Sequence, residues 1–405
     1  MIREIFLLQN PWRENQDYTF NLKKRDIFDT LLNNLDNELI LGLIGSRQVG
    51  KSSLIYLLIE HLLKNKVSVN DIFYFNLDDL QLHSLFSSVP EFIQFMGTGN
   101  KRKYIFIDGI QRLSSPGLFL KEIFDLKRNL KIVYSGSSQL EVKAKTKEHL
   151  VGRGRVFTIH RLSFNEYLDF ASPITRKEAV NQILLYGSYP AVAKEKPAIN
   201  KKLRIKDVFQ SYVQKDLVDF IQVKDIDKYN KFLIRVAMQS GNLLNIHSLS
   251  KSLGISRGHV EEYLNILEQT FISMRIYPFH KNYNKEITRT PKLYFLDLGL
   301  RNFILNNFND LELRTDVGNL FETFYFTELI AQDHYGLKKI NFWRTTNKTE
   351  IDFIVLSDER VEAIEVKWDD KKRPKSFYTI EKLYPGIKTR VVSIEDYFNS
   401  DNNLS

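Results

Sequence analysis

The first 160 residues alternate between short apolar segments and longer segments in which apolar residues recur at helical spacing. Four apolar segments, each followed by polar residues, are expected to be strands: Leu39–Ile44, Asp71–Leu77, Tyr104–Ile107 and Leu130–Tyr134. Strands of this kind predict a parallel sheet that is covered on both faces. Ligands bind beyond the carboxyl ends of such strands, where we expect Asp78, Asp79, Asp108 and Ser135–Ser138.

The rest of the chain follows other patterns. Residues 162–239 are predicted to be mainly helical. Residues 243–295 predict two helices joined by a turn and followed by a β-hairpin. A helix is expected near Gly318–Gln332, and strands are expected at Lys339–Arg344, Ile351–Leu356 and Val361–Val366.

A glycine-rich segment follows the first predicted strand. Gly45-Ser-Arg-Gln-Val-Gly50-Lys51-Ser52-Ser53 matches the pattern G-x-x-x-x-G-K-[ST] without a mismatch. Between a strand and a helix, such a loop directs backbone N–H groups and the positive end of the helix at phosphates. We expect Lys51 to reach the β- and γ-phosphates and the Ser52 hydroxyl to bind Mg²⁺. A plain turn before a helix is the alternative, but the context predicts binding of ATP or GTP.

The apolar strand Tyr104-Ile-Phe-Ile-Asp108 ends in a carboxylate, which is expected to hold Mg²⁺ through water. Many ATPases of this type carry a glutamate next, which polarises the attacking water, but this chain has Gly109. Loss of a general base costs about 10²–10⁴ in rate, so we expect slow hydrolysis. Asp78, Asp79 and Gln111 are the candidates to replace the glutamate.

Two more segments offer phosphate contacts. Ser135-Gly-Ser-Ser138 follows the fourth strand, where a hydroxyl would contact the γ-phosphate or serve only a serine-rich turn. Arg153 and Arg155 form a compact cationic pair. Either arginine would stabilise phosphate within the chain or from a neighbouring subunit, and a solvated basic loop is the alternative.

Composition narrows the class of protein. A chain of 405 residues exceeds one ordinary core, and 43% apolar residues suffice to bury several. The absence of cysteine excludes disulfides, thiolate zinc sites and cysteine nucleophiles, and is compatible with a reducing compartment. No run approaches the roughly 18 apolar residues of a membrane span, and the N-terminus lacks a signal-peptide layout, so we expect a cytoplasmic protein. The net charge of +9 favours a polyanionic partner.

Residues 246–267 fit a winged helix-turn-helix, with Ser256 as the N-cap of its second helix. The buried face of that helix is expected to contain Val260, Tyr263, Leu264 and Leu267. Its exposed face carries Arg257 and His259, but also three carboxylates, Glu261, Glu262 and Glu268, which oppose contact with phosphates. The hairpin that follows is more basic, with His280, Lys281, Lys285, Arg289 and Lys292. Direct contact with DNA and a role as an interdomain adaptor both remain open.

The C-terminal region contains a second set of chemical residues. Glu322 in a predicted helix, Asp352 in one strand, and Glu365 and Lys367 in the next match the pattern E…D…E-x-K. Glu365 and Lys367 share a face because residues i and i+2 of a strand point the same way. The carboxylates would bind Mg²⁺ or Mn²⁺, the metal would generate hydroxide, and the lysine would orient the nucleophile or neutralise charge. An inactive nuclease fold and an unrelated domain are the alternatives.

The order of these motifs resembles a known family. The segments that carry the resemblance are Gly45–Ser53, Ile105–Arg112, Ser135–Ser138, Gly152-Arg153, Leu162–Glu166, Tyr186–Pro190, Thr290–Leu300 and Glu365–Lys367. Over nearly the whole chain they resemble the prokaryotic AAA-type ATPases joined to a restriction-endonuclease-like C-terminal domain of unknown function. Members usually have Asp-Glu where this chain has Asp108-Gly109, a departure that bears on hydrolysis rather than on ATP binding.

Together these patterns predict an α/β protein with four parts. They are a P-loop ATPase core with a parallel sheet at 1–160, a helical lid at 161–240, a winged helix-turn-helix at 241–300 and an α/β restriction-endonuclease-like domain at 301–405. The leading hypothesis is an ATP-controlled, metal-dependent DNA nuclease or DNA-processing ATPase with weak hydrolysis. The alternative is a non-cleaving, nucleotide-dependent switch that binds DNA or a protein partner.

Each hypothesis assigns residues and cofactors. The predicted nucleotide-site residues are Gly45, Arg47, Gln48, Val49, Gly50, Lys51, Ser52, Ser53, Asp108, Ser135 and Arg153. Ser52 and Asp108 are expected to bind Mg²⁺ beside ATP. The predicted catalytic residues of the second site are Glu322, Asp352, Glu365 and Lys367, of which the three carboxylates would bind Mg²⁺ or Mn²⁺. DNA is the expected partner, and a homo-oligomer would supply an arginine between subunits.

Overall fold

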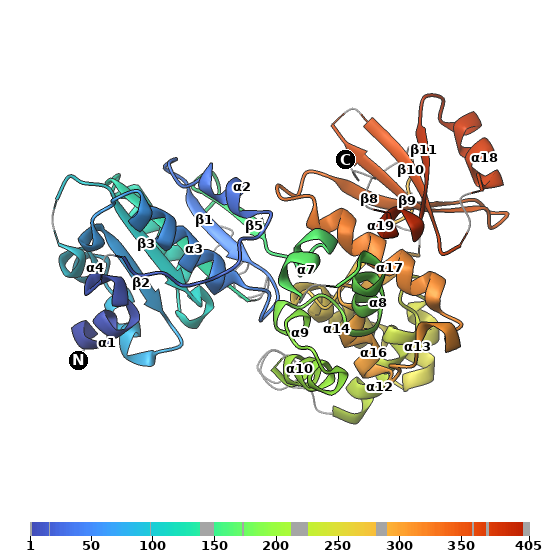
Figure 1. Ribbon diagram of the computed structural model, residues 1–405, viewed down its shortest axis with the longest axis horizontal. Helices are drawn as coiled ribbons and strands as arrows, with labels where there is room; N and C mark the ends of the chain where they lie inside the picture. The colour runs from blue at the N-terminus through green and yellow to red at the C-terminus, as the bar shows by residue number, and fades with distance from the viewer. Residues whose placement is uncertain are drawn as a thin grey trace. The chain divides into compact units, whose positions relative to one another are not determined.

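The chain folds into two compact units. A computed structural model describes residues 2–15, 17–97, 99–137, 150–171, 174–211, 226–280, 290–358, 360–369 and 372–399. The first unit is Met1–His160 and the second is Arg161–Ser405 (Figure 1). The boundaries expected within residues 161–405 stay predictions, because the division into two units does not separate a lid, a winged helix and a C-terminal domain.

The first unit is built on a five-stranded parallel sheet in the order β2-β3-β4-β1-β5. Its strands are β1 (Ile40–Ile44), β2 (Ile72–Asn76), β3 (Lys103–Asp108), β4 (Leu130–Gly136) and β5 (Gly154–Thr158). Its helices are α1 (Ile2–Gln9), η1 (Pro11–Arg13), α2 (Phe28–Leu32), α3 (Lys51–Lys64), η2 (Val69–Asp71), η3 (Leu80–Phe86), α4 (Val89–Met96), η4 (Ile110–Arg112) and α5 (Pro116–Asp125). All five residues of β1 are buried, as expected for a central strand covered on both faces.

The four strands predicted from apolar runs are confirmed, but the fifth strand was not predicted. Part of this segment, residues 152–155, was expected either to contact phosphate or to be a solvated basic loop. β5 pairs in parallel with β1, with Ile40 opposite Gly154 and Ile44 opposite Thr158. It is an edge strand in which Arg155 and Val156 are exposed, so it lacks the continuous apolar run that identifies the central strands.

The other edge strand, β2, is covered by the N-terminal segment. The buried Asn10 side chain accepts a hydrogen bond from the Tyr74 N–H (2.9 Å) and donates one to the Tyr74 carbonyl (2.8 Å). Gln9 does the same at Asn76, accepting from its N–H at 2.8 Å and donating to its carbonyl at 3.4 Å. Two side-chain amides therefore replace a neighbouring strand and protect the edge from pairing with another chain.

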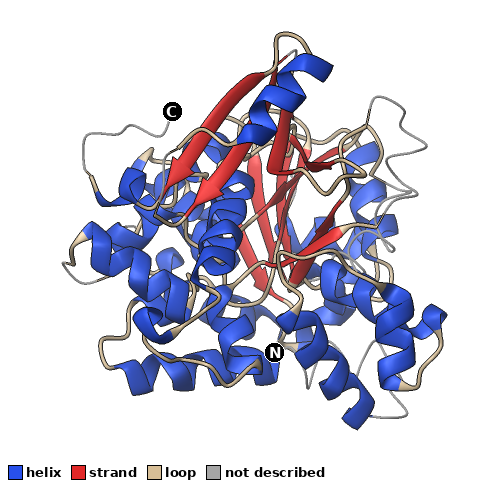
Figure 2. Ribbon diagram, turned by 90° about the vertical axis from the view of Figure 1, so that its right-hand side faces the viewer, coloured by secondary structure: helices blue, strands red, loops and turns tan. Residues whose placement is uncertain are grey.

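The second unit begins with a region composed mainly of helices (Figure 2). Its helices are α7 (Phe164–Phe170), α8 (Arg176–Tyr186), α9 (Pro190–Ala193), α10 (Ala198–Ser211), α12 (Ile226–Met238), α13 (Ile246–Leu253), α14 (Arg257–Gln269), α16 (Leu298–Ile304) and η6 (Leu311–Leu313). A two-stranded antiparallel sheet joins β6 (Ser273–Ile276) to β7 (Lys292–Phe295). The predicted helix-turn-helix and hairpin are confirmed as α13, α14, β6 and β7, and Ser256 caps α14 as expected.

The C-terminal part of the second unit is a mixed four-stranded sheet in the order β11-β10-β9-β8. Its elements are α17 (Val317–Ala331), β8 (Lys339–Arg344), β9 (Glu350–Ser357), β10 (Arg360–Lys367), α18 (Lys375–Leu383), β11 (Lys388–Ser393) and α19 (Glu395–Phe398). β8 to β10 are antiparallel, whereas β11 runs parallel to β10. Trp343, Ile354 and Phe377 are among the residues of the core between this sheet and α18. The predicted helix and three strands are confirmed.

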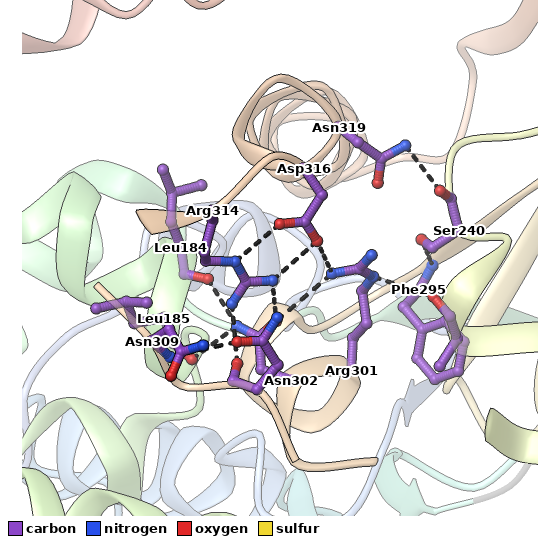
Figure 3. A network of polar contacts seen from close by, with 12 residues as sticks. Leu184, Leu185, Ser240, Phe295, Arg301, Asn302, Asn309, Arg314, Asp316 and Asn319 are labelled. Atoms are coloured by element: carbon purple, nitrogen blue, oxygen red, sulfur yellow. Dashed lines mark hydrogen bonds and ion pairs between the residues drawn. The ribbon is translucent and has the colours of Figure 1, made fainter. Parts of the chain in front are cut away.

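A buried polar network joins the helices before this sheet (Figure 3). The Asp316 carboxylate pairs with the Arg301 guanidinium (3.0 Å) and with the Arg314 guanidinium (2.8 Å). Arg314 also donates to the Asn302 side chain (3.1 Å), which in turn donates to two backbone carbonyls at the end of α8 (both 2.9 Å). The network therefore links α8, α16 and the start of α17.

Within the part of the chain that the structure describes, no helix is both long enough and apolar enough to span a bilayer.

Candidate functional site

The predicted phosphate-binding loop connects β1 to α3. The buried Lys51 ammonium donates to the carbonyls of Gly45 (2.9 Å) and Ser46 (2.7 Å), so it lies inside its own loop. A methyl group on Gly45 would overlap the carbonyl oxygen of Ile159, so only glycine fits where the loop passes the end of β5. The loop therefore has the tight, strand-to-helix shape that presents N–H groups to phosphates.

Asp108 ends β3 with both of its carboxylate oxygens hydrogen-bonded. The Ser135 hydroxyl donates to Oδ1, and the Tyr74 hydroxyl donates to Oδ2 at 3.2 Å. Ser135 also accepts a hydrogen bond from the Gly109 N–H (3.1 Å), so it connects β4 to the end of β3. Burial raises the pKa of Tyr74 and the nearby Asp108 raises it further, so Tyr74 stays a neutral donor. Tyr74 was not anticipated, since a tyrosine within a buried strand reads in sequence as core.

These features fit ATP and Mg²⁺. Asp108 and the loop follow strands that are two positions apart in the sheet, which is roughly 10 Å and leaves room for phosphates between them. The assignment of nucleotide contacts to Arg47, Gln48, Val49, Gly50, Lys51, Ser52, Ser53 and Ser135 stays a prediction, as does Mg²⁺ binding by Ser52 and Asp108. Bound Mg²⁺ would neutralise charge on the phosphates.

The candidates to replace the missing glutamate are engaged elsewhere. Asp78 pairs with Arg112 (3.0 Å), and Asp79 accepts the Gln81 N–H (3.0 Å) as the cap of η3. Both follow the edge strand β2, three strands from β1, or roughly 14 Å away. Gln111 donates to the Ser137 hydroxyl (3.4 Å), at the end of the strand next to the loop. Of the three candidates, only Gln111 is hydrogen-bonded to a residue that follows the strand next to β1.

The structure does not support a contact between Arg153 and a nucleotide in the same chain. Arg153 precedes β5, and β5 begins beside Ile40 at the start of β1, whereas the phosphate-binding loop follows the end of β1. Its guanidinium pairs with Asp125 at the end of α5 (2.8 Å). Because β5 is a strand that runs parallel to β1, Arg153 lies at the amino ends of the strands, opposite the end from which the loop emerges. Its supply to a neighbouring subunit stays a prediction.

In the second unit, the four predicted nuclease residues come from α17, β9 and β10. Glu365 is buried, and both of its carboxylate oxygens have partners: the Ser376 hydroxyl (2.8 Å) and the Lys367 ammonium (2.9 Å). Burial would lower the pKa of Lys367, but the attraction of Glu365 outweighs it and raises the pKa. The shared strand face predicted for Glu365 and Lys367 is thus seen as a direct ion pair.

Asp352 lies near the other two carboxylates. It accepts the Val366 N–H (2.9 Å) across the sheet. Burial raises the pKa of Asp352 well above its usual range, and the negative charges of Glu322 and Glu365 raise it further. In the described residues, however, no group of three or more His, Cys, Asp or Glu side chains is arranged to hold a metal ion. The three carboxylates share an electrostatic environment without forming the predicted ligand cluster.

A buried lysine supplies positive charge beside these carboxylates. The Lys292 ammonium, on β7, lies 2.6 Å from Glu350 Oε1 and 3.2 Å from Glu322 Oε1. Burial would lower the pKa of Lys292, but the attraction of Glu322, Asp352 and Glu350 outweighs it and raises the pKa. Tyr294, two residues along β7, donates to Glu322 (2.5 Å). A cation supplied by the chain therefore lies beside Glu322, one of the three carboxylates predicted to bind a metal ion.

The assignment of Lys292 to a basic DNA-binding hairpin is wrong, because its side chain is only 4% exposed. The signal was present in the sequence: Lys292 lies within Pro291-Lys-Leu-Tyr-Phe-Leu296, where a single charge among apolar residues indicates burial with a partner. Lys281, Lys285 and Arg289 lie outside the described residues.

The predicted winged helix, formed by α13, α14, β6 and β7, carries less unpaired negative charge than its sequence indicates. Arg275 on β6 pairs with Glu261 and Glu268 of α14 (both 2.7 Å). Two of the three carboxylates that oppose DNA therefore share one internal cation, which offsets one of their two negative charges. At the start of α14, Arg257 contacts His247 (2.8 Å), and both side chains are exposed. Contact of this module with DNA stays a prediction.

Two segments that carry the family resemblance, Tyr186–Pro190 and Thr290–Leu300, are hydrogen-bonded to each other in the structure. The buried Asp297 accepts hydrogen bonds from the N–H groups of Ser188 (2.9 Å) and Leu300 (2.8 Å). It also lies 3.8 Å from Arg161 Nε. Burial raises the pKa of Asp297, while Arg161 and the backbone donors oppose that rise. Asp297 therefore links the segment before α9 to the start of α16.

The chain matches three family models. An AAA domain matches residues 37–168, a domain of unknown function (DUF8612) matches residues 177–311, and a second domain of unknown function (DUF4143) matches residues 317–401. Residues 37–168 form an AAA-type ATPase domain. This domain, with the P-loop described above, implies binding of ATP and Mg²⁺.

Relatives extend over most of the chain but carry no known activity. An uncharacterized protein of Methanocaldococcus jannaschii is 24% identical over 92% of this chain and 84% of its own length. An uncharacterized protein of Haemophilus influenzae is 21% identical over 86% of this chain and 87% of its own length.

Solved structures resemble the chain only weakly. The Aeropyrum pernix ORC2 protein in its ADP form has a TM-score of 0.35 and 12% identity, over 69% of this chain and 91% of that protein. The replication initiator DnaA bound to AMPPCP and single-stranded DNA has a TM-score of 0.33 and 15% identity, over 63% of this chain and 91% of that protein. TM-scores of this size do not establish a shared fold.

Proposed function

We propose that this protein is an ATP-dependent switch that hydrolyses ATP slowly and acts on DNA or a protein partner without cutting DNA. The observation that supports the absence of cutting is Lys292, whose ammonium pairs with Glu322 and Glu350 where a nuclease would hold a metal ion. The slow hydrolysis follows from Gly109, which offers no carboxylate to the attacking water.

In this proposal the nucleotide site works through positioning and charge. The loop N–H groups bind the phosphates, Lys51 exchanges its two carbonyl partners for phosphate oxygens, and Asp108 holds the water shell of Mg²⁺. Ser135 and Tyr74 keep the Asp108 carboxylate oriented. Without a base at residue 109, the ATP-bound state persists, which is what a switch needs.

The C-terminal site has a structural role in this proposal. Lys292 belongs to β7 of the winged-helix hairpin, whereas Glu322 lies in α17 and Glu350 is the first residue of β9. The ion pairs therefore connect the winged helix to the C-terminal sheet. This connection favours the adaptor interpretation of the winged helix, with DNA or protein bound elsewhere on the module.

The second candidate is the metal-dependent nuclease. It is favoured by the negative charges of Glu322 and Glu365, which raise the pKa of Asp352, since carboxylates gathered in this way attract a divalent cation. In that case the ion would compete with Lys292 for Glu322, and Lys367 would neutralise charge on the scissile phosphate. The donor set as it stands fits this metal poorly, because Glu365 has no carboxylate oxygen without a partner.

Two measurements test these proposals. Calorimetry with Mg·ATP should show binding to the parent and none to Lys51→Ala, and equal affinities would refute the assigned nucleotide site. Plasmid and branched DNA should stay intact with Mn²⁺, with or without ATP. Cleavage that is lost in both Asp352→Ala and Glu365→Ala would establish the nuclease instead of the switch.

A further inference from the structure

An arginine outside the glycine-rich segment holds the phosphate-binding loop from behind. Arg25 belongs to the segment before β1 and is 7% exposed. Its Nη1 donates to the Val49 carbonyl (2.8 Å), and its Nη2 donates to the His160 carbonyl (3.0 Å). Nη1 also lies 3.8 Å from the position that a Cβ on Gly50 would take. The guanidinium therefore lies directly against the loop.

The bond to Val49 fixes the direction of the next N–H group. A peptide unit is planar and trans, so its C=O and N–H bonds point in opposite directions. Because the Val49 carbonyl points at Arg25, the N–H of Gly50 points away from Arg25. Loops of this type bind phosphates through such N–H groups, so a free peptide rotation at this position would remove one donor.

The bond to His160 anchors the guanidinium to the sheet. His160 follows the end of β5, where the Ile159 N–H donates to the Ile44 carbonyl at the end of β1 (2.7 Å). Arg25 thus connects the loop to the strand beside the one from which the loop emerges. The two carbonyls match the fork of a guanidinium, whereas the compact ammonium of lysine cannot reproduce that fork.

We propose that Arg25 is a positioning residue for nucleotide binding, which holds the Val49–Gly50 peptide so that the loop accepts the phosphates of ATP. The inference rests on the proposed binding of ATP at this loop and adds a residue that the loop motif does not contain. Its effect is on affinity for the nucleotide rather than on the stability of the fold.

Arg102 supplies a matched control in the same unit. Its guanidinium also donates to backbone carbonyls, those of Leu35 (3.2 Å), Asp36 (2.9 Å) and Asn37 (2.8 Å). Arg102 precedes β3, at the amino ends of the strands, whereas the phosphate-binding loop lies at their carboxyl ends. Replacing Arg102 therefore removes comparable hydrogen bonds without touching the loop.

The test compares Mg·ATP affinity, by calorimetry, with the melting temperature of the nucleotide-free protein for Arg25→Met, Arg25→Lys and Arg102→Met. Arg25→Met should weaken ATP binding by about tenfold or more, because charge-assisted hydrogen bonds to the loop are lost. Arg25→Lys should lie between Arg25→Met and the parent. Arg102→Met should melt at a lower temperature but bind ATP as the parent does.

The outcomes separate this inference from the proposed function. ATP affinity of Arg25→Met equal to that of the parent overturns it, and so does an equal loss of affinity in Arg102→Met. If Arg25→Met does not fold, Arg25→Lys decides, and parent-like affinity in that variant overturns the inference. If the parent itself binds no ATP, the proposed nucleotide site fails together with it.

Discussion

Replacement of Lys292 by methionine tests the central feature of the second unit. Methionine keeps a long, unbranched side chain but removes the ammonium that pairs with Glu322 (3.2 Å) and Glu350 (2.6 Å). The side chains of these two glutamates are only 16% and 22% exposed, so water replaces the lost cation poorly. We expect the Lys292→Met protein to fold but to be less stable than the parent.

The size of the loss follows from the partners that remain. Removing one member of a buried ion pair typically costs about 3–5 kcal/mol. Glu322 keeps its hydrogen bond from Tyr294, and Glu350 keeps its ion pair with Arg344, so we expect the lower end, about 3 kcal/mol. For a unit of this size, that loss lowers the melting temperature by about 6–12 °C.

The assay is thermal and denaturant unfolding of the full chain, with Lys201→Met as the control. Lys201 is also a buried lysine of the second unit, but its ammonium donates to the Val192 carbonyl (3.1 Å). Losing one such hydrogen bond from a charged donor costs about 1.5 kcal/mol at the low end of its range. If Lys292→Met is no less stable than Lys201→Met, then Lys292 does not neutralise the carboxylates. Added Mn²⁺ that restores the stability of Lys292→Met but leaves the parent unchanged would show that lysine and metal compete.

Three further outcomes can be measured. Gly109→Glu should raise ATP turnover by about tenfold or more over Gly109→Gln, and equal rates would show that another group already activates water. Because residue 109 has a φ of 81°, either substitution costs about 1–2 kcal/mol of stability. Parent turnover should lie well below about 1 s⁻¹ in a phosphate-release assay, and an ordinary rate would contradict the switch. Partial burial would raise the pKa of Asp316, but Arg314 and Arg301 outweigh it and lower the pKa to about 2. Asp316→Asn should therefore lower the free energy of unfolding by about 2 kcal/mol near neutral pH, after allowance for partial exposure. This difference shrinks as pH falls from about 4 toward 2, and melting data that do not depend on pH would refute it.

The contact between Asp316 and Arg301 affects the pKa of the two side chains differently. Burial lowers the pKa of Arg301 even though Asp316 is beside it, whereas the pKa of Asp316 is lowered by the same contact. The pH dependence of this pair comes from Asp316, because a guanidinium stays charged at any pH at which the protein is folded.

The nucleotide site could be predicted because its chemistry is contiguous in the chain. Gly45, Gly50, Lys51 and Ser52 lie within eight positions of each other, between an apolar strand and a helix. The conformation of such a loop follows from the local sequence, and its neighbours in space are its neighbours in the chain. The strands β1 to β4 could be predicted for the same reason, since each central strand is a continuous apolar run.

The tertiary structure alone decided which distant residues meet. Arg25 belongs to no motif, and the motifs that contain Lys292 and Arg153 do not indicate which residues they pair with. Parallel pairing of β5 with β1 places Arg153 at the end of the strands away from the loop. Packing places Arg25 behind the loop and Lys292 beside Glu322, which lies 30 positions further along the chain. Burial of a charge is costly unless a partner is present, so each position is fixed by a partner that only the complete packing supplies. The residue types in the sequence limited the chemistry to phosphate binding and carboxylate clusters, whereas folding determined that a buried lysine pairs with one of the predicted metal-binding carboxylates, Glu322.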